Sequence, residues 1–450
     1  MDIREECGVV GVYSKTGKSV VPLLYKALFA LQHRGQDAAG MAIYGEERII
    51  ERKGLGLVDS IFKKEDLELD GTMGVGHTRY PTIGKCTEAD VAPSVYDGIA
   101  VSHNGHVPNY EDLKKELGKA GYKFHSTVDS EPIAYYLHKE KDLETAVKMI
   151  MDKFEGAFSE AAIYHDKLIG FRDHHAIRPL VWGENKDFFM FASESVALDI
   201  NSIEHKGDIH GGELLIIEDG RLRREQIKQA EPHYCMFEYV YFSRPDSVIN
   251  GRSVMNVRRL LGEELANESP VKADIIIPVP DTSRTAAMAY AKATGAEYDE
   301  GLIKNRYVGR TFIMPSQEKR REAVRLKLNP VKELVADKIV VLIDDSIVRG
   351  TTMKEIVGLL KDAGAKEVHV RITSPPIKAP CFYGVDIPTF KELIANKKSV
   401  EEIGKFLGAD SLAYLSLDGL KKSLGVPICD ACLTGNYHTD YVKKLAEEAK

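Results

Sequence analysis

Three continuous apolar runs in the second half of the chain limit its fold most strongly. They are ADIIIPVPD (273–281), KIVVLIDDS (338–346) and EVHVRITSP (367–375). A strand without apolar–polar alternation is buried on both faces, which is typical of a parallel sheet covered by helices on either side. Helical patterns that end at glycine lie between these runs. The alternation predicts a doubly wound α/β domain, which we place over residues 231–450.

The first half of the chain has a different pattern, in which short β-like runs are broken by turn residues. These runs are CGVVGVYS, GMAIYG, TMGVGHTRY, GIAVSHNG and FSEAAIYH. Apolar residues at helical spacing are found in SVVPLLYKALFALQHRG, DSEPIAYYLHKE and LETAVKMIMDKF. Many strands with a few helices between them predict a layered α+β domain, which we place over residues 7–230.

Composition excludes several classes of protein. The chain has 450 residues, of which 44% are hydrophobic, and a formal net charge of −7. An acidic chain of this kind is not attracted as a whole to nucleic acid or to an anionic membrane. No run approaches the roughly 20 apolar residues that a membrane span needs. The leader MDIREE is too short and too acidic for a secretory signal, so we expect a cytoplasmic protein.

The stretch KIVVLIDDSIVRGTTMKEI combines a buried strand, two acids and the start of a helix. Asp344 and Asp345 follow the strand, and the loop 346–350 leads into a helix at Thr351. Backbone N–H groups and hydroxyls at a helix N-terminus can hold a phosphate. Carboxylates at the end of an α/β strand can hold ribose hydroxyls or Mg²⁺. An ordinary acidic strand end before a capped helix would contain the same two acids, so the pair alone does not decide.

The whole stretch resembles the phosphoribosyl-pyrophosphate (PRPP) signature of type I phosphoribosyltransferases. In the form DDSIVRGTT it resembles one branch of them, the glutamine PRPP amidotransferases, although Arg349 stands where many members of the superfamily have a second glycine. The resemblance implies a PRPP site made of Asp344, Asp345, Ser346, Arg349, Gly350, Thr351 and Thr352. It also implies that Thr282, in PVPDTSR, helps the two acids to hold Mg²⁺.

A basic segment, KNRYVGRTF, lies upstream of the two acids and gives a second indication of a PRPP site. Its cations, among them Lys304 and Arg306, are not balanced by acids and show no helical amphipathicity. A solvated surface would explain the later charges up to Lys327, but this part favours a functional loop. In the family that the chain resembles, the segment closes over PRPP.

Five short motifs in the first half are weak singly. They are CGVVGVY, LQHRGQDAAG, GHTRYPT, SHNG and TVDSE, and a lone cysteine in such a run is most often a core residue. Together and in this order they resemble the class II glutamine amidotransferases, which are N-terminal-nucleophile hydrolases. The resemblance implies that Cys7 is the nucleophile, with its own α-amine as base. The other residues that it implies are Asn104 and Gly105 for the oxyanion, Arg79 for the glutamine carboxylate, Asp129 for the glutamine amine, and Arg34 as an orienting residue.

Four of the remaining cysteines suggest a metal centre. They are Cys235, Cys381, Cys429 and Cys432, the last two in a C-x-x-C pair. From spacing alone, structural zinc, an iron–sulfur cluster and a redox pair all remain open. The resemblance implies a structural [4Fe–4S] cluster that holds the C-terminal tail. It also implies that residues 1–6 are a propeptide, since one group of these amidotransferases has both features.

The resemblance covers nearly the whole chain and implies one reaction. PRPP, glutamine and water would give 5-phosphoribosylamine, glutamate and pyrophosphate, the first step of de novo purine biosynthesis. Ammonia would pass between two sites of this pentosyltransferase. We expect a homotetramer that is inhibited by purine nucleotides and has no nucleic-acid or membrane partner. Two rivals stay open: another glutamine-dependent transferase with the same first domain, and a non-catalytic regulator that senses PRPP.

Overall fold

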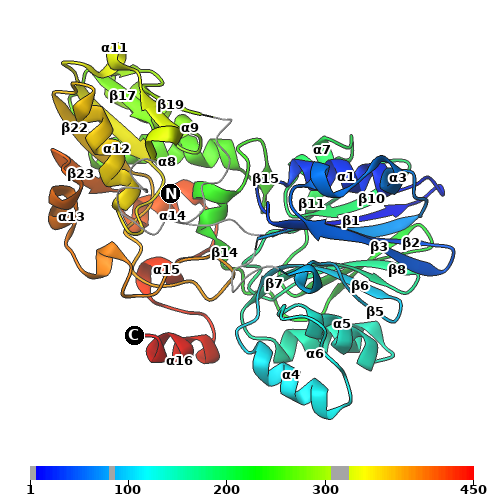
Figure 1. The fold of residues 1–450 in the computed structure, drawn as a ribbon. Coiled ribbons are helices and arrows are strands. Elements are labelled where there is room, and N and C mark those ends of the chain that lie inside the picture. The colour runs from blue at the N-terminus through cyan, green and yellow to red at the C-terminus, as the bar shows by residue number, and fades with distance from the viewer. Residues whose placement is uncertain (1–6, 81–86, 306–323) are drawn as a thin grey trace.

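The computed structural model describes residues 7–80, 87–305 and 324–450. Two parts lie side by side, one built around two antiparallel sheets and the other around one parallel sheet (Figure 1). This arrangement confirms the fold class that the sequence predicts for each half. Within the described residues, no helix has the length and apolar character needed to cross a membrane.

The first part consists of two antiparallel sheets packed face to face. One sheet has the order β11 (Glu204–Asp208), β9 (Val181–Glu184), β10 (Phe188–Ala192), β1 (Gly8–Ser14), β4 (Met73–Arg79), β2 (Ala38–Gly45) and β3 (Arg48–Leu55). The other has the order β13 (Arg221–Gln226), β12 (Glu213–Glu218), β8 (Lys167–Arg172), β7 (Ala157–Tyr164), β6 (Ile99–His106) and β5 (Ser94–Tyr96). Val9 and Val75 of the first sheet share a core with Ala161 and Leu215 of the second, so the two inner faces form one layer.

Helices cover both outer faces of this sandwich (Figure 1). Val10 and Val12 point away from the inner layer and pack against α1 (Val21–Ala30). The opposite face is covered by α4 (Tyr110–Lys119), α5 (Glu131–Lys139) and α6 (Leu143–Lys153). The first part also has four short helices, α2 (Val58–Ile61), α3 (Lys64–Leu67), η1 (Glu88–Asp90) and α7 (Val196–Asp199). The result is a four-layer arrangement with helices outside and strands inside.

A linker follows the last strand of the sandwich and runs into the second part. Its elements are β14 (Tyr234–Cys235), η2 (Glu238–Phe242), β15 (Val248–Ile249) and β16 (Arg252–Ser253). β14 pairs in parallel with β24 (Ile428–Cys429) near the other end of the chain. The C-terminal tail is therefore joined to the linker by a backbone ladder.

The second part has a parallel sheet with helices on both faces. The strand order is β18 (Glu297–Tyr298), β17 (Ile275–Pro278), β21 (Ile339–Asp344), β22 (Glu367–Ile372) and β23 (Ser411–Tyr414). In β21, Val341 and Ile343 pack with α8 (Val254–Glu268) and α9 (Arg284–Thr294), whereas Val340 and Leu342 pack with α12 (Thr351–Asp362) and α13 (Val400–Leu407). Burial of both faces is the reason for the unbroken apolar run in the sequence.

Smaller elements complete the second part. A short antiparallel pair is formed by β19 (Leu302–Lys304) and β20 (Leu328–Pro330). The remaining helices are α11 (Lys332–Val335), η3 (Ile394–Asn396), α14 (Leu417–Leu424), α15 (Ala431–Thr434) and α16 (Asp440–Glu448). The α16 hydroxyl of Tyr441 lies 3.5 Å from Asp112 of α4, so the tail returns to the first part.

Two candidate active sites and a cysteine cluster

One pocket in the first part is lined by five of the residues predicted to bind or cleave glutamine. They are Cys7, Arg79, Asn104, Gly105 and Asp129. Cys7 comes directly before β1, Arg79 ends β4, and Asn104 and Gly105 lie near the end of β6. Asp129 lies two residues before α5. The ends of three strands and the start of this helix thus bring together side chains that are more than 100 positions apart in the sequence.

Cys7 is half-buried at the start of its strand. Its sulfur lies 3.9 Å from the carbonyl oxygen of Tyr80, and its own carbonyl oxygen accepts a hydrogen bond of 3.1 Å from Nε of Arg34. Cys7 therefore lines the pocket, while its backbone carbonyl is held by Arg34.

Asn104 and Gly105 have the properties of an oxyanion-binding pair. Nδ2 of Asn104 is buried and has no hydrogen-bond partner among the described residues. Gly105 has φ +154°, and a Cβ added to it would lie 1.9 Å from the carbonyl oxygen of Ala157, so only glycine fits. A buried donor without a partner is costly, and a ligand oxygen would satisfy it.

Arg79 and Asp129 supply opposite charges to the same pocket. Nε of Arg79 is buried without a hydrogen-bond partner in the described part of the chain. Asp129 accepts a hydrogen bond of 2.9 Å from the N–H of Val107, and Nδ1 of His106 lies 3.2 Å from its carboxylate. Burial alone would raise the pKa of Asp129, but the imidazole of His106 and the charge of His103 hold it well below its usual range. A ligand that carries both a carboxylate and an ammonium group would match this pair.

Two histidines of the pocket escaped the sequence reasoning although they stand inside the quoted motifs. His77 and His103 line the pocket, and Nε2 of His77 lies 2.8 Å from the carbonyl oxygen of His103. Burial and the charge of Arg79 lower the pKa of His77 to about 3. Burial also opposes a charge on His103, but Glu160, 2.5 Å from its Nδ1, raises the pKa of His103 to about 9. Their positions in GHTRY and SHNG were the available signal.

Arg34 lies outside this pocket and has a structural environment. It is fully buried and donates to Glu194 over 2.7 Å and to Glu238 over 2.6 and 2.9 Å. Glu238 belongs to η2 in the linker, and Arg34 also holds the carbonyl oxygen of Cys7. Arg34 therefore connects the nucleophile to the junction between the two parts, and the two acids that bind it were not found from the sequence.

The predicted phosphate site lies at the carboxyl end of β21. Asp344 ends the strand, and Asp345 accepts hydrogen bonds of 2.6 Å from Thr282 and 2.7 Å from Ser346. Burial raises the pKa of both acids, and the neighbouring Asp345 adds to the effect on Asp344. Two adjacent buried carboxylates are stabilised by a divalent cation, so these residues fit the Mg²⁺ site that the sequence implies.

Thr282 lies just before the helix α9 but is not its N-cap residue. The helix α9 begins at Arg284, and the residue at the N-cap position is Ser283. The hydroxyl of Ser283 makes no capping bond and lies 3.3 Å from Asp344. Both hydroxyls thus lie against the two acids at the carboxyl end of β21, and Ser283 is a further residue that was not predicted from the sequence.

The loop after the acids leads into α12 as predicted. Gly350 has φ +76°, a left-handed conformation that glycine adopts without strain, and the helix starts at Thr351 and Thr352. Arg349 turns toward Glu392, with N–O distances of 2.9 and 3.1 Å. Lys304 binds Asp281 over 2.9 Å, beside Thr282. Arg306 lies outside the described residues, as do residues 1–6.

The four predicted ligand cysteines come together although they are far apart in sequence. Cys235 of β14 is paired in register with Cys429 of β24, and the carbonyl of Cys432 accepts hydrogen bonds from Lys378 and Ala379 beside Cys381. Burial and the charges of Cys381, Cys429 and Cys235 raise the pKa of Cys432. No disulfide joins the cysteines that the structure describes.

The cysteine region also touches the glutamine pocket. Gly384, three residues after Cys381, lines that pocket, and a Cβ added to it would lie 3.1 Å from the backbone of Gly105. Arg178 of the first part donates to the carbonyl oxygen of Tyr383 over 2.8 Å. The second part of the molecule therefore contributes directly to the wall of the first site.

Each half of the chain matches a known protein family of the kind that the sequence predicts. Residues 82–199 match the family described as "Glutamine amidotransferase domain", and residues 248–374 match "Phosphoribosyl transferase domain". The amidophosphoribosyltransferase of Methanocaldococcus jannaschii is 45% identical, over 96% of this chain and 98% of its own. That of Methanothermobacter thermautotrophicus is 44% identical, over 99% and 97%.

A solved structure shows the same fold along nearly the whole chain. It is the glutamine PRPP amidotransferase from B. subtilis complexed with ADP and GMP, with a TM-score of 0.90 and 41% identity over 96% of this chain and 98% of that one. Both domain families, the full-length relatives and this shared fold lead to the same answer. The chain belongs to the amidophosphoribosyltransferase family.

Proposed function

We propose that this chain converts PRPP, glutamine and water into 5-phosphoribosylamine, glutamate and pyrophosphate, the first step of de novo purine biosynthesis. The observation that carries the proposal is that one chain holds a cysteine pocket with glutamine-like charge complementarity and a twin-acid site at a parallel sheet edge. Family membership agrees with it.

In the glutamine pocket, each described residue has one task. Arg79 holds the α-carboxylate of glutamine and Asp129 its α-ammonium group. The Cys7 thiolate attacks the carboxamide carbon, and a C–S bond replaces the C–N bond as ammonia leaves. Asn104 and the N–H of Gly105 hold the oxyanion that forms in this step. Water then cleaves the thioester and releases glutamate.

The α-amine of Cys7 takes the proton of the thiol in this scheme and then passes it to the departing amide nitrogen, which leaves as ammonia. That amine is free only after residues 1–6 have been removed, so we propose that they are a propeptide. Arg34 keeps Cys7 in place through its carbonyl oxygen. His103, whose pKa burial would lower but the neighbouring Glu160 raises, lines the same pocket as Cys7.

At the second site, the chain binds PRPP between the acids and the start of α12. The loop 346–350 and the hydroxyls of Thr351 and Thr352 hold the 5-phosphate, since N–H groups at a helix start bind anions. Asp344 and Asp345 hold the ribose hydroxyls. With Thr282 they would hold Mg²⁺, which would supply positive charge to the pyrophosphate. Lys304 and Arg306 supply cations to the pyrophosphate end. Ammonia forms the new C–N bond at C1 as the C1–O bond to pyrophosphate breaks.

The family resemblance also implies that Arg349 binds PRPP. In this structure Arg349 forms an ion pair with Glu392 at the surface, so it must leave that pair to reach a bound phosphate. Exposed ion pairs contribute little, about 0–1 kcal/mol, so this change is inexpensive.

We propose that Cys235, Cys381, Cys429 and Cys432 would hold a [4Fe–4S] cluster. Two observations support the proposal: Cys235 and Cys429 are paired in register, and the pKa of Cys432 is raised by burial and by the charges of the other three cysteines. Four cysteines can bind either such a cluster or a zinc ion, and the family resemblance favours the cluster. A bound cluster would supply a covalent link between linker and tail.

Regulation and assembly follow the family resemblance. The B. subtilis protein was solved with ADP and GMP, which supports purine nucleotides as inhibitors of this chain too. We propose a homotetramer in the cytoplasm, as the sequence analysis expects.

Product analysis of the full-length protein tests the function. Incubated with PRPP, glutamine and Mg²⁺, it should release glutamate and pyrophosphate in equal amounts, and ammonium salts should replace glutamine as nitrogen source. Binding of PRPP without release of pyrophosphate from either nitrogen source would instead identify a regulator that senses PRPP.

A further inference from the structure

Four histidines and one glutamate gather where the first part of the molecule, the linker and the C-terminal tail meet. His174 and His175 lie between β8 and β9, Glu231 and His233 lie between β13 and β14, and His438 lies between α15 and α16. None of these residues has a task in the reaction described above. They are also separate from the four cysteines in chemistry, since they offer nitrogen and oxygen donors.

The backbone holds the first two segments of this group in register. The N–H of Glu231 donates to the carbonyl of His174 over 2.9 Å, and the N–H of His233 donates to that of His175 over 2.7 Å. The N–H of His175 is further fixed by the carboxylate of Asp173 at 2.9 Å. The side chains therefore project from a defined scaffold rather than from loose loops.

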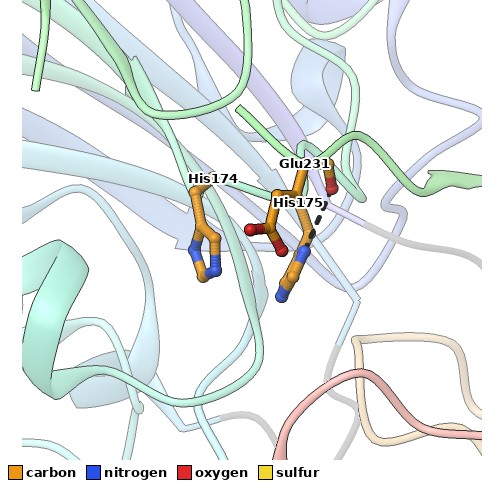
Figure 2. A group of neighbouring side chains, drawn as sticks. All are labelled: His174, His175 and Glu231. Carbon is orange, nitrogen blue, oxygen red and sulfur yellow. Dashed lines mark hydrogen bonds between the residues drawn. The ribbon is translucent and has the colours of Figure 1, made fainter. Parts of the chain in front are cut away.

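The donor atoms of His174, His175 and Glu231 all lie within 4.8 Å of one another. Figure 2 shows both imidazole rings pointing to the same side, with the Glu231 carboxylate between them. Two nitrogen ligands and one carboxylate at zinc bond lengths of about 2.0–2.2 Å lie at most about 4.3 Å apart. The observed distances between the three donor atoms are thus close to those between the ligand atoms of a bound zinc ion.

Hydrogen bonds on the far side of the rings orient the imidazoles. Nδ1 of His175 lies 3.1 Å from the carbonyl oxygen of Glu231, so Nδ1 is the protonated nitrogen and Nε2 keeps its lone pair (Figure 2). Nδ1 of His233 lies 2.8 Å from the same oxygen. A carbonyl that accepts from one ring nitrogen while the other is left for a ligand is the usual outer support of a metal-binding histidine.

His438 adds an independent observation from the tail. Its Nε2 is buried and has no hydrogen-bond partner among the residues that the structure describes. Its ring lies 4.0 Å from that of His233 and 5.5 Å from that of His175, measured between centroids. A buried nitrogen without a partner is costly unless something binds near it.

The nearby cation Lys228 has partners outside this group. Its Nζ lies 3.4 Å from Asp152 and donates to the carbonyl oxygen of Met151 over 2.9 Å. Its charge is therefore balanced away from the three donor side chains.

We propose that His174, His175 and Glu231 bind a divalent transition-metal ion of the zinc type, beside the imidazole of His438. Two histidines and one glutamate are an established ligand set for zinc, with a fourth position left open. Imidazole ligands favour zinc, copper or nickel over Mg²⁺ and Ca²⁺, which prefer oxygen. The ion fixes the linker to the first part of the molecule next to the tail, and so stabilises the junction on which both active sites depend.

The test uses full-length protein purified without oxygen, with Co²⁺ as a spectroscopic probe. We expect about one Co²⁺ per chain to bind apart from any iron, with d–d absorption bands and no thiolate-to-cobalt charge-transfer band. Glu231→Gln and His174→Gln should each weaken Co²⁺ binding by about tenfold or more, since loss of an outer-shell partner already costs about 10–100-fold. Zn²⁺ should compete with Co²⁺ and raise the Tm of the wild type but not of Glu231→Gln.

His125→Gln is the matched control, because His125 is an exposed histidine elsewhere in the first part. It should bind Co²⁺ like the wild type. Glu231 is exposed, so Glu231→Gln keeps the test decisive even if His174→Gln does not fold. Unchanged Co²⁺ affinity in Glu231→Gln, or a spectrum dominated by thiolate charge transfer, would overturn the proposal.

Discussion

His103 and Glu160 form a buried acid–base pair one residue away from Asn104. Nδ1 of His103 lies 2.5 Å from the Glu160 carboxylate, and both side chains are almost completely buried. The attraction of Glu160 outweighs burial and raises the pKa of His103 to about 9. This pair therefore lies directly beside the candidate oxyanion donor, with His103 in the wall of the glutamine pocket.

The pair gives the folded state a pH-dependent stability. Because the folded pKa of His103, about 9, is above the unfolded value of 6.5, the stabilisation is complete below about pH 6.5 and is lost as the pH rises through about 9. Burial raises the pKa of Glu160 as well, which offsets part of this stabilisation. The free energy of unfolding, measured by denaturant titration from pH 6 to pH 10, should fall more steeply for the wild type than for His103→Gln. Parallel pH curves for the two proteins would contradict this assignment.

The bond between Glu6 and Cys7 is the second feature at the scale of single residues. The proposed mechanism uses the α-amine of Cys7 as the base, and an amide nitrogen cannot take that proton. Intact-mass measurement of fully active protein should therefore give a chain that begins at Cys7. Full glutamine-dependent activity in a chain that keeps residues 1–6 would exclude the terminal-amine mechanism.

The junction between the two parts depends on a few elements that meet at Arg34. This residue follows α1, pairs with Glu194 after β10, and reaches Glu238 in η2. Its guanidinium is completely buried and also holds Cys7. A buried ion pair of this kind is costly to break, because one partner is then left charged and without compensation.

Arg34→Met should destabilise the protein by about 3–5 kcal/mol and reduce glutamine-dependent activity more than ammonia-dependent activity. The control is Lys422→Met, which removes an exposed ion pair between α14 and Glu264 of α8. It should change stability by no more than about 1 kcal/mol. Thermal and urea unfolding of both variants provide the comparison, and equal effects would show that Arg34 is not a special junction residue.

Strands and helices were predicted correctly where a local sequence pattern was sufficient to identify them. β21 and α12 were recognisable because a strand buried on both faces has an unbroken apolar run, and a helix begins after Gly350. The short strand β18 and the two-residue β14 were not predicted. Two residues carry no period of their own, and these strands exist only because neighbouring backbone pairs with them.

The candidate sites likewise contain residues that a local motif predicts and residues that only the folded structure brings together. Cys7, Arg79, Asn104 and Asp129 were found through motifs that resemble a known family. Glu194 and Glu238, which bind Arg34, have no motif, because their partner comes from a distant part of the fold. Gly384 is likewise brought to the glutamine pocket only by the packing of the two parts.

At the scale of the whole molecule, the proposed iron–sulfur cluster would determine how firmly the tail is held. β14 and β24 are only two residues long, and a two-stranded pair of this size is marginal alone. A cluster bound by Cys235 and Cys429 would reinforce that pair. It would also fix the segment around Gly384 against the glutamine pocket.

Protein purified without oxygen should therefore be brown and contain iron and acid-labile sulfide, and Cys429→Ser should lose both. The variant should also unfold at lower temperature, because the link between linker and tail is gone. Metal analysis and visible absorption provide the readout. Active, colourless protein that contains zinc at these cysteines would exclude the cluster.

The most direct test of the account separates the two active sites in one variant. The central claim is that the first site only makes ammonia and the second only transfers it. Cys7→Ala removes the nucleophile but leaves Asp344, Asp345 and α12 untouched. Pyrophosphate release from PRPP should then fall to background with glutamine and remain within about twofold of the wild type with saturating ammonium salt. Loss of both activities in a folded Cys7→Ala protein, or retention of both, would contradict the two-site account.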